Sequence, residues 1–269
     1  TNIVALLAAR LTGQKTRENA CERNQYSSFI QGFSPLRRWA IDRLVRWLYP
    51  GAHAVIGNTD GVTRDIAEIA GLAREKIGVK PNPAPESTEL DAGRAASLDH
   101  EWFEDDGPIA VAIGRLVPQK DYPMMFRAVA ASGEKLRLAI LGTGPDQAAL
   151  EAYAEEIGIS DRVDFLGFRM DRFAFLVRAD VFLLSSITEG FPNALIEAVS
   201  AGIPAVTTDC AGGGAREIMG SEFPDRIVPV GDALAMAGEI KKILAARSAG
   251  EKGIERDRAT RIAQRFQIG

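Results

Sequence analysis

Short apolar runs alternate with amphipathic stretches through the second half of the chain. The apolar runs predict strands at 109–113, 136–141, 163–166, 181–184, 205–207 and 227–229. The stretches with helical spacing include 124–131, 147–157 and 193–201. Short apolar strands that alternate with amphipathic helices indicate a parallel sheet covered on both faces.

The first part of the chain has a less regular pattern. Apolar residues at helical spacing predict helices over 1–12, 35–49 and 62–70, and the run 52–57 predicts a buried strand. The proline-rich segment that begins at Lys80 is a dense turn signal and ends this part.

These patterns together predict an α/β protein of two domains. Residues 1–83 form a partial N-terminal domain, 84–106 a linker rich in acidic residues, and 107–269 a Rossmann-like C-terminal domain with a parallel sheet. The length of 269 residues suffices for two domains of ordinary size.

The composition excludes several classes of protein. The chain is 46% hydrophobic and 25% charged, which is typical of a globular protein. We find no apolar stretch near the roughly 18 residues of a membrane span and no secretory signal. Cys21 and Cys210 are far apart, and His53 and His100 are isolated, so we predict no disulfide framework, no metal site and no cofactor. A reducing, cytoplasmic setting fits best.

The charge is unevenly distributed along the chain. Its net charge is −4, yet residues 1–50 contain more basic than acidic residues. The helix expected over 35–49 carries Arg37, Arg38, Arg43 and Arg46. These arginines suit a peripheral contact with anionic lipid at the inner membrane face; alternatively, the helix packs its tryptophans into the core and solvates its arginines. Nucleic acid is not an expected partner, because no basic stripe with interleaved aromatic residues is present.

The loops that follow the strands are the places to search for a ligand. In parallel α/β sheets, ligands bind beyond the carboxyl ends of the strands, where helix N-termini present backbone N–H groups. After the first expected strand come Gly114, Arg115 and Lys120. Arginine can bind a phosphate with two hydrogen bonds, and lysine adds a compact charge. Two solvated surface cations are the alternative.

A second glycine-containing loop follows the next strand. The segment Gly142-Thr143-Gly144 does not match the dinucleotide motif GxGxxG, since Gln147 occupies the third glycine position. A tight turn is the favoured role, with close approach of the backbone to a ligand as the alternative.

The loop and helix from Thr188 to Glu197 are the most informative. Pro192 suits the first helical position, where its missing N–H has no cost. The free N–H groups of Asn193, Ala194 and Leu195 would then form an anion site suited to a diphosphate.

Two acidic residues accompany this anion site. Glu197 lies about one helical turn further along, where a carboxylate can accept both hydroxyls of a ribose, and Glu189 precedes the helix. Unneutralised carboxylates beside phosphates repel them unless each has a hydroxyl-bearing partner, which favours a sugar nucleotide as ligand. Three glycines follow Cys210-Ala211 and allow close backbone approach, or merely a flexible loop.

This combination of motifs resembles the retaining family 4 glycosyltransferases of the GT-B fold. The resemblance rests on Gly114-Arg115 with Lys120, on the Glu189 and Glu197 pair, and on Gly202-Ile203-Pro204 leading to Asp209 and the glycines. It covers about residues 50–230. The segment Glu189-Gly190-Phe191-Pro192-Asn193 is similar to that of members that build lipid-linked or surface polysaccharides.

The resemblance implies an activity and roles for individual residues. It implies transfer of a sugar from a nucleotide donor to a saccharide or lipid-linked acceptor, with retention and without a metal, and we expect the donor to be a UDP-sugar. Arg115 and Lys120 would neutralise the donor diphosphate, and Glu197 would hold the ribose. Glu189 and the backbone from Gly190 to Asn193 would contact the donor sugar near its anomeric carbon.

Some parts of the family pattern have no counterpart in this sequence. We therefore expect a chain truncated at the N-terminus and at the C-terminus. Two other hypotheses follow: a nucleotide-sugar-binding fragment without catalysis, and a sugar-nucleotide epimerase, against which the spacing of the two glutamates argues.

Overall fold

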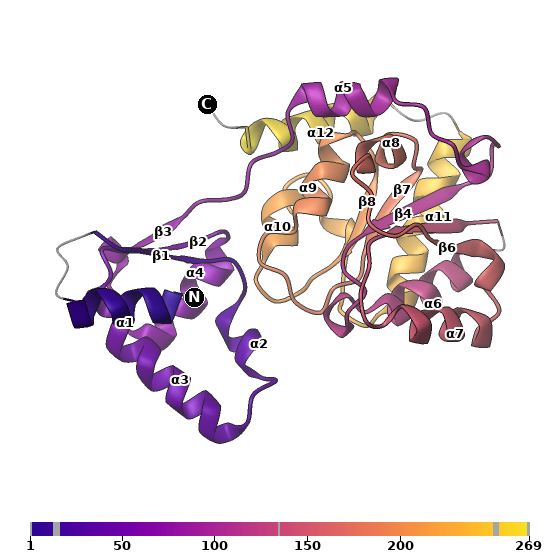
Figure 1. The fold of residues 1–269 in the computed structure, drawn as a ribbon. Coiled ribbons are helices and arrows are strands. Elements are labelled where there is room, and N and C mark those ends of the chain that lie inside the picture. Colours follow the sequence, from indigo (N-terminus) through magenta and orange to yellow (C-terminus); the bar gives the residue numbers. More distant parts are fainter. Residues whose placement is uncertain (1, 13–16, 134, 250–252, 268–269) are drawn as a thin grey trace. The chain divides into compact units, whose positions relative to one another are not determined.

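The chain folds into two compact units, shown as a ribbon in Figure 1. The computed structural model describes residues 2–12, 17–133, 135–249 and 253–267. Thr1 of the first expected helix and Lys15 of the basic section lie outside the described residues. The first unit comprises Thr1–Asn82, Thr188–Phe191 and Ala211–Gly214, and the remaining residues form the second.

The first unit contains a three-stranded parallel sheet in the order β1-β2-β3. Its elements are α1 (Asn2–Thr12), β1 (Asn19–Glu22), α2 (Tyr26–Ile30), α3 (Pro35–Leu48), β2 (Ala54–Gly57), α4 (Asp60–Ala70) and β3 (Ile77–Val79). Thr59 caps α4 by accepting a hydrogen bond from the Val62 N–H at 3.0 Å, and Gly71 ends the helix in the left-handed conformation. The expected helices and the strand near 52–57 are present, whereas β1, β3 and α2 were not predicted.

The tryptophans of α3 do not lie in the core. Val45 and Leu48 are the buried residues of this helix, whereas Trp39 is 60% exposed and Trp47 is 48% exposed. The Arg43 guanidinium lies 5.5 Å from the Trp39 ring centroid, and the Arg10 guanidinium lies 4.6 Å from the Trp47 ring centroid. The interpretation that this helix buries its tryptophans is therefore wrong.

The second unit is built on a six-stranded parallel sheet in the order β6-β5-β4-β7-β8-β9. Its strands are β4 (Ile109–Ile113), β5 (Arg137–Leu141), β6 (Val163–Phe165), β7 (Val181–Leu184), β8 (Ala205–Thr208) and β9 (Ile227–Val228). All six were predicted, β4 and β7 with the same bounds and the others within two residues at either end. The regular apolar runs explain this agreement, since a strand buried on both faces has few polar positions.

Helices cover both faces of this sheet. They are α5 (Ser87–Ala95), α6 (Tyr122–Ser132), α7 (Gln147–Glu156), α8 (Arg172–Leu176), α9 (Asn193–Ser200), α10 (Gly214–Met219), α11 (Ala233–Ser248) and α12 (Gly253–Arg265). Ala110 and Ala112 of β4 belong to one core cluster with residues of α6 and α11, while Ile109 and Val111 are buried on the opposite face. Helix α6 packs against α11, α5 against α8, and α9 against α12. The α/β expectation with a Rossmann-like parallel sheet is confirmed.

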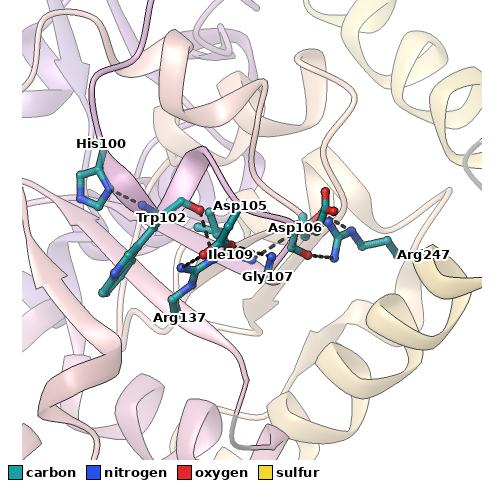
Figure 2. Close-up of polar contacts among 9 residues, drawn as sticks. His100, Trp102, Asp105, Asp106, Gly107, Ile109, Arg137 and Arg247 are labelled. Carbon is teal, nitrogen blue, oxygen red and sulfur yellow. Dashed lines mark hydrogen bonds and ion pairs between the residues drawn. The ribbon is translucent and has the colours of Figure 1, made fainter.

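The segment before β4 is fixed to the second unit by polar contacts (Figure 2). The Arg137 guanidinium forms a two-point ion pair with Asp105 and donates to the Trp102 carbonyl oxygen at 3.0 Å. His100 Nδ1 accepts from the Trp102 N–H at 3.2 Å. Hydrogen bonds from Arg137 hold the pKa of Asp105 below its usual value. The range 84–106, expected as a linker, thus contains helix α5 and this anchored segment. None of the helices in the described ranges is long and apolar enough to cross a bilayer.

Candidate functional site

The second unit has a topological switch point between β4 and β7. From β4 the chain proceeds to β5 and β6 on one side, and from β7 it proceeds to β8 and β9 on the other. Adjacent loops therefore leave the carboxyl ends of β4 and β7 in opposite directions, and ligands of such sheets bind in the resulting crevice. The residues predicted to bind the nucleotide follow these two strands.

The loop after β4 places Lys120 over the strand end. A Cβ atom built on Gly114 would lie 3.1 Å from Lys120 Cε, so the absence of a side chain at Gly114 makes room for the lysine. The Gly114 carbonyl oxygen accepts a hydrogen bond from the Tyr122 hydroxyl at 3.1 Å. Arg115 is exposed, and Lys120 is partly buried.

Hydrogen bonds join this loop to the end of β7. Ser185 Oγ donates to the Lys120 carbonyl oxygen at 2.7 Å, and the Ile187 N–H donates to the Gln119 carbonyl oxygen at 2.9 Å. Asp121 adopts a left-handed conformation with φ of 44° and caps α6 by accepting from the Met124 N–H. The backbone of Lys120 is thus held beside the strand that leads to α9.

The glycines after β5 allow the loop after β5 to pack closely against the loop after β4. A Cβ atom on Gly142 would lie 1.9 Å from the Gly114 carbonyl oxygen, and one on Gly144 would lie 2.1 Å from that of Leu116. The Leu116 N–H donates to the Thr143 carbonyl oxygen at 3.0 Å. These two glycines thus let the neighbouring loop approach, and the turn itself lies at Pro145 and Asp146, just after the segment for which it was predicted.

Helix α9 begins at Asn193, as the helical pattern predicted, but the position of Pro192 differs from the expectation. Pro192 is its N-cap residue rather than its first helical residue, with ψ of 101°. The Leu195 N–H is not free, because it donates to the Pro192 carbonyl oxygen at 3.1 Å. Of the three N–H groups expected at the anion site, that of Leu195 is therefore excluded; Asn193 and Ala194 are the first two residues of the helix.

Glu197 has a partner that the sequence did not reveal. Arg172 Nε donates to Glu197 Oε2 at 2.9 Å, and Arg172 Nη2 donates to Oε1 at 3.0 Å. The carboxylate is therefore neutralised within the protein, and the argument that it requires a hydroxyl-bearing partner does not hold. Arg172 is the first residue of α8, a five-residue helix that was not predicted; the Asp171-Arg172 sequence alone is a common surface pattern.

Glu189, Gly190 and Phe191 lie in a segment that pairs with the glycine loop. The Glu189 N–H donates to the Ala211 carbonyl oxygen at 3.0 Å, and Thr188 and Ala211 form a parallel bridge. Gly212 and Gly213 have φ of 102° and 76°, which explains glycine at both positions. Glu189 is partly buried, and Gly190 and Phe191 are buried.

A further arginine–carboxylate pair follows β8. Arg216 Nε donates to Asp209 Oδ1 at 2.7 Å, and Arg216 Nη2 donates to Oδ2 at 2.5 Å. Within the described part of the chain, no group of three or more His, Cys, Asp or Glu residues is placed to hold a metal ion.

Comparison with solved structures shows the same fold. Anabaena HepE in complex with UDP matches with a TM-score of 0.77 at 19% identity, over 98% of this chain and 72% of that one. The apo form of the lipopolysaccharide outer core galactosyltransferase WaaB matches with a TM-score of 0.69 at 21% identity, over 99% and 70% of the two chains.

Sequence relatives include glycosyltransferases whose names refer to an undecaprenol-linked substrate and to lipopolysaccharide core. The Campylobacter jejuni N-acetylgalactosamine-N,N'-diacetylbacillosaminyl-diphospho-undecaprenol 4-alpha-N-acetylgalactosaminyltransferase is 27% identical over 90% of this chain and 64% of its own length. The Rhizobium meliloti lipopolysaccharide core biosynthesis glycosyltransferase LpsE is 29% identical over 80% of this chain and 63% of its own. The chain thus spans a little under two thirds of both relatives.

A family model covers most of the second unit. The model described as "Glycosyl transferases group 1" matches residues 97–265, which include the loops after β4 and β7 and the pair formed by Arg172 and Glu197. By this match, the chain belongs to the group 1 glycosyl transferases.

Proposed function

We propose that this chain binds a nucleoside-diphosphate sugar and transfers the sugar to a saccharide or lipid-linked acceptor. The observation that carries the proposal is the position of Arg115, Lys120 and the start of α9 on the two loops of the switch point. Membership of the group 1 glycosyl transferases and the UDP in HepE support a UDP-sugar as donor.

The cations after β4 serve the diphosphate. When the glycosidic bond to the donor breaks, negative charge accumulates on the departing nucleoside diphosphate. Arg115 and Lys120 stabilise that charge where it forms, together with the first N–H groups of α9. This assistance requires no metal ion, so EDTA should leave the transfer rate unchanged.

Glu197 serves the ribose of the donor. A carboxylate offers about four acceptor positions over its two oxygens, and Arg172 occupies one on each oxygen. The other positions accept hydrogen bonds from the ribose hydroxyls. The pairing with Arg172 also removes the repulsion that a bare carboxylate would exert on the diphosphate.

Glu189 and the backbone from Gly190 to Asn193 serve the donor sugar. The loop from 188 to 191 leads directly into α9, so its residues immediately precede the helix start in the chain. We propose that the transfer retains the anomeric configuration, as in the family 4 enzymes that the sequence resembles. An NMR spectrum of the product shows this directly, because α- and β-linked anomeric protons differ in coupling constant.

Helix α3 of the first unit suits a peripheral contact with an anionic membrane. Trp39 and Leu36 are exposed, and arginines of the same helix accompany them. Exposed tryptophan beside arginine is typical of helices that lie at the lipid headgroups. The names of the relatives, which include an undecaprenol-linked substrate and lipopolysaccharide core, support an acceptor at such a surface.

Vesicle co-sedimentation tests this contact. The chain should bind vesicles of anionic lipid, and the Trp39→Ala variant should bind them less, whereas the Phe168→Ala variant, changed at an exposed aromatic of the second unit, should bind like wild type. Binding that is indifferent to salt and to Trp39→Ala would exclude the contact.

A thermal-shift panel followed by a transfer assay tests the main proposal. Ligands that bind the folded state raise the melting temperature, so UDP and UDP-sugars should do so more than uridine. Incubation with UDP-sugar and lipid-linked acceptor should then release UDP. Binding without UDP release for any sugar would leave a nucleotide-sugar-binding module, and the absence of any nucleotide effect would overturn the proposal.

A further inference from the structure

The pair formed by Arg172 and Glu197 joins two helices that begin at the same edge of the sheet. Helix α8 follows β6 and helix α9 follows β7, and both strands are parallel members of one sheet. Arg172 is the first residue of α8, and Glu197 is the fifth residue of α9. Side chains on a helix point back toward its N-terminus, so the Glu197 carboxylate is directed toward the start of α9.

Arg172 is itself held in place. Its guanidinium lies 4.6 Å from the ring centroid of Phe173, whose side chain is buried. The hydrogen bonds to Glu197 raise the pKa of Arg172 above its usual value, and nearby Glu89 acts in the same direction while burial opposes both. The guanidinium is thus a fixed cation with one planar face on an aromatic ring.

The two hydrogen bonds fix the plane of the Glu197 carboxylate. A glutamate side chain has three rotatable bonds and loses that freedom when it binds a ligand, which weakens the binding. Two parallel bonds from a planar guanidinium restrict the carboxylate before the ligand arrives. One acceptor position remains on the outer side of each oxygen, where a ribose hydroxyl can approach without displacing Arg172.

Another two-point arginine pair of the second unit, formed by Arg261 and Glu222, serves for comparison. Arg261 of α12 donates to both oxygens of Glu222 at 3.1 and 2.8 Å, and its side chain is 56% exposed. The side chains of Arg172 and Glu197 are 32% and 17% exposed, so the arginine of this pair is more buried than Arg261. Glu197 lies on α9, the helix that follows β7 at the switch point, whereas Glu222 and Arg261 do not belong to the loops or helices directly after β4 or β7.

We propose that Arg172 is a positioning residue that orients the Glu197 carboxylate to accept the ribose hydroxyls of the donor nucleotide. The inference rests on the proposed function, since it assigns a role within the same nucleotide site. Arg172 itself acts through Glu197 and need not touch the nucleotide.

Titration calorimetry with UDP and 2′-deoxy-UDP tests the inference. Wild type should bind UDP about tenfold more tightly than 2′-deoxy-UDP, because the lost hydroxyl leaves a charged acceptor without its hydrogen bond. In Arg172→Gln, the affinity for UDP should fall by about tenfold while that for 2′-deoxy-UDP changes little, so the discrimination between the two is lost. Arg261→Gln, which breaks a pair of the same geometry elsewhere, should keep the wild-type ratio.

A purely structural role would give a different result. It would lower the melting temperature of Arg172→Gln and weaken both nucleotides equally, so an unchanged affinity ratio overturns the inference. If Arg172→Gln does not fold, Arg172→Lys tests the inference instead. Lysine keeps the charge but not the planar two-point geometry, so the ratio of UDP affinity to 2′-deoxy-UDP affinity should lie between that of wild type and one. A wild-type ratio in Arg172→Lys overturns the inference.

The outcomes also separate this inference from the proposed function. A wild-type chain that binds UDP but does not distinguish it from 2′-deoxy-UDP overturns the ribose contact and leaves nucleotide binding intact. A wild-type chain that binds neither nucleotide overturns the proposed function itself.

Discussion

The strands of the two units differ in how completely they are buried. Every residue of β7 and β8 in the second unit is buried, whereas β1 and β2 in the first unit alternate between buried and partly exposed positions. A sheet covered on both faces holds its strand ends firmly, because each strand packs above and below. The second unit therefore offers fixed loops on which charged side chains can be placed.

The two units also differ in the exposure of their large aromatic side chains. In the second unit Phe126, Phe175 and Phe182 are fully buried, whereas Trp39 and Trp47 of α3 remain exposed. The comparison teaches that buried phenylalanines fill the core that supports the strand ends of the second unit, whereas α3 of the first unit presents its tryptophans at the surface.

The largest expected effect is the loss of stability when a core residue of the second unit is truncated, compared with truncation of a surface residue of the first unit. Ile140 is fully buried in β5, and Leu36 of α3 is 76% exposed. Ile140→Ala should lower the free energy of unfolding by about 2–5 kcal/mol, whereas Leu36→Ala should change it by less than about 0.5 kcal/mol. Denaturant unfolding measures both. Equal losses would contradict the difference in burial.

The next effect concerns the cations of the second unit. Lys120→Ala should lower kcat/KM for transfer by about 10²–10³-fold, by analogy with removal of a donor that stabilises charge in the transition state. Lys242→Ala, which removes an exposed lysine of α11 paired with Glu239, serves as the control and should be near wild type. A loss shared by both variants would point to general charge effects instead of a site.

A smaller effect is expected for Glu197. Glu197→Ala should weaken UDP binding by about tenfold, because it removes an ionised acceptor of the ribose and leaves Arg172 without its partner. Calorimetry measures the affinity, with Glu222→Ala as the matched loss of an arginine-paired glutamate. Unchanged UDP affinity in Glu197→Ala would remove the ribose role.

The smallest effects are changes in stability with pH, which occur in acid for the second unit and in alkali for the first. The pKa of Asp105 is lowered by Arg137, so its contribution to stability is present above the unfolded value of about 3.9 and is lost as pH falls. In the first unit, burial and the hydrogen bond to Glu22 raise the pKa of Tyr49, so its contribution is lost as pH rises above about 10.

Melting temperatures of two variants measure these contributions. The deficit of Asp105→Asn relative to wild type should shrink in acid, and that of Tyr49→Phe should shrink in alkali. Deficits that stay constant over the whole pH range would contradict both assignments.

Much of the second unit was predictable because its strands are continuous apolar runs. The short strands β1 and β3 were not, since they have only four and three residues, with one buried position in β1 and none in β3. At the site, the loops with Arg115, Lys120 and Glu197 were found from their places after strands. Arg172 was missed because its partner is 25 residues away and only the fold brings the two together. The N-cap position of Pro192 was missed because its sequence pattern also fits the first helical position.

Hydrogen exchange with and without saturating UDP tests the central claim most directly, because it locates the nucleotide on the chain. The account predicts slower exchange in peptides that contain 114–120 and the start of α9, and unchanged exchange in α3. Bound UDP that protects other segments and leaves both switch-point loops unchanged would contradict it.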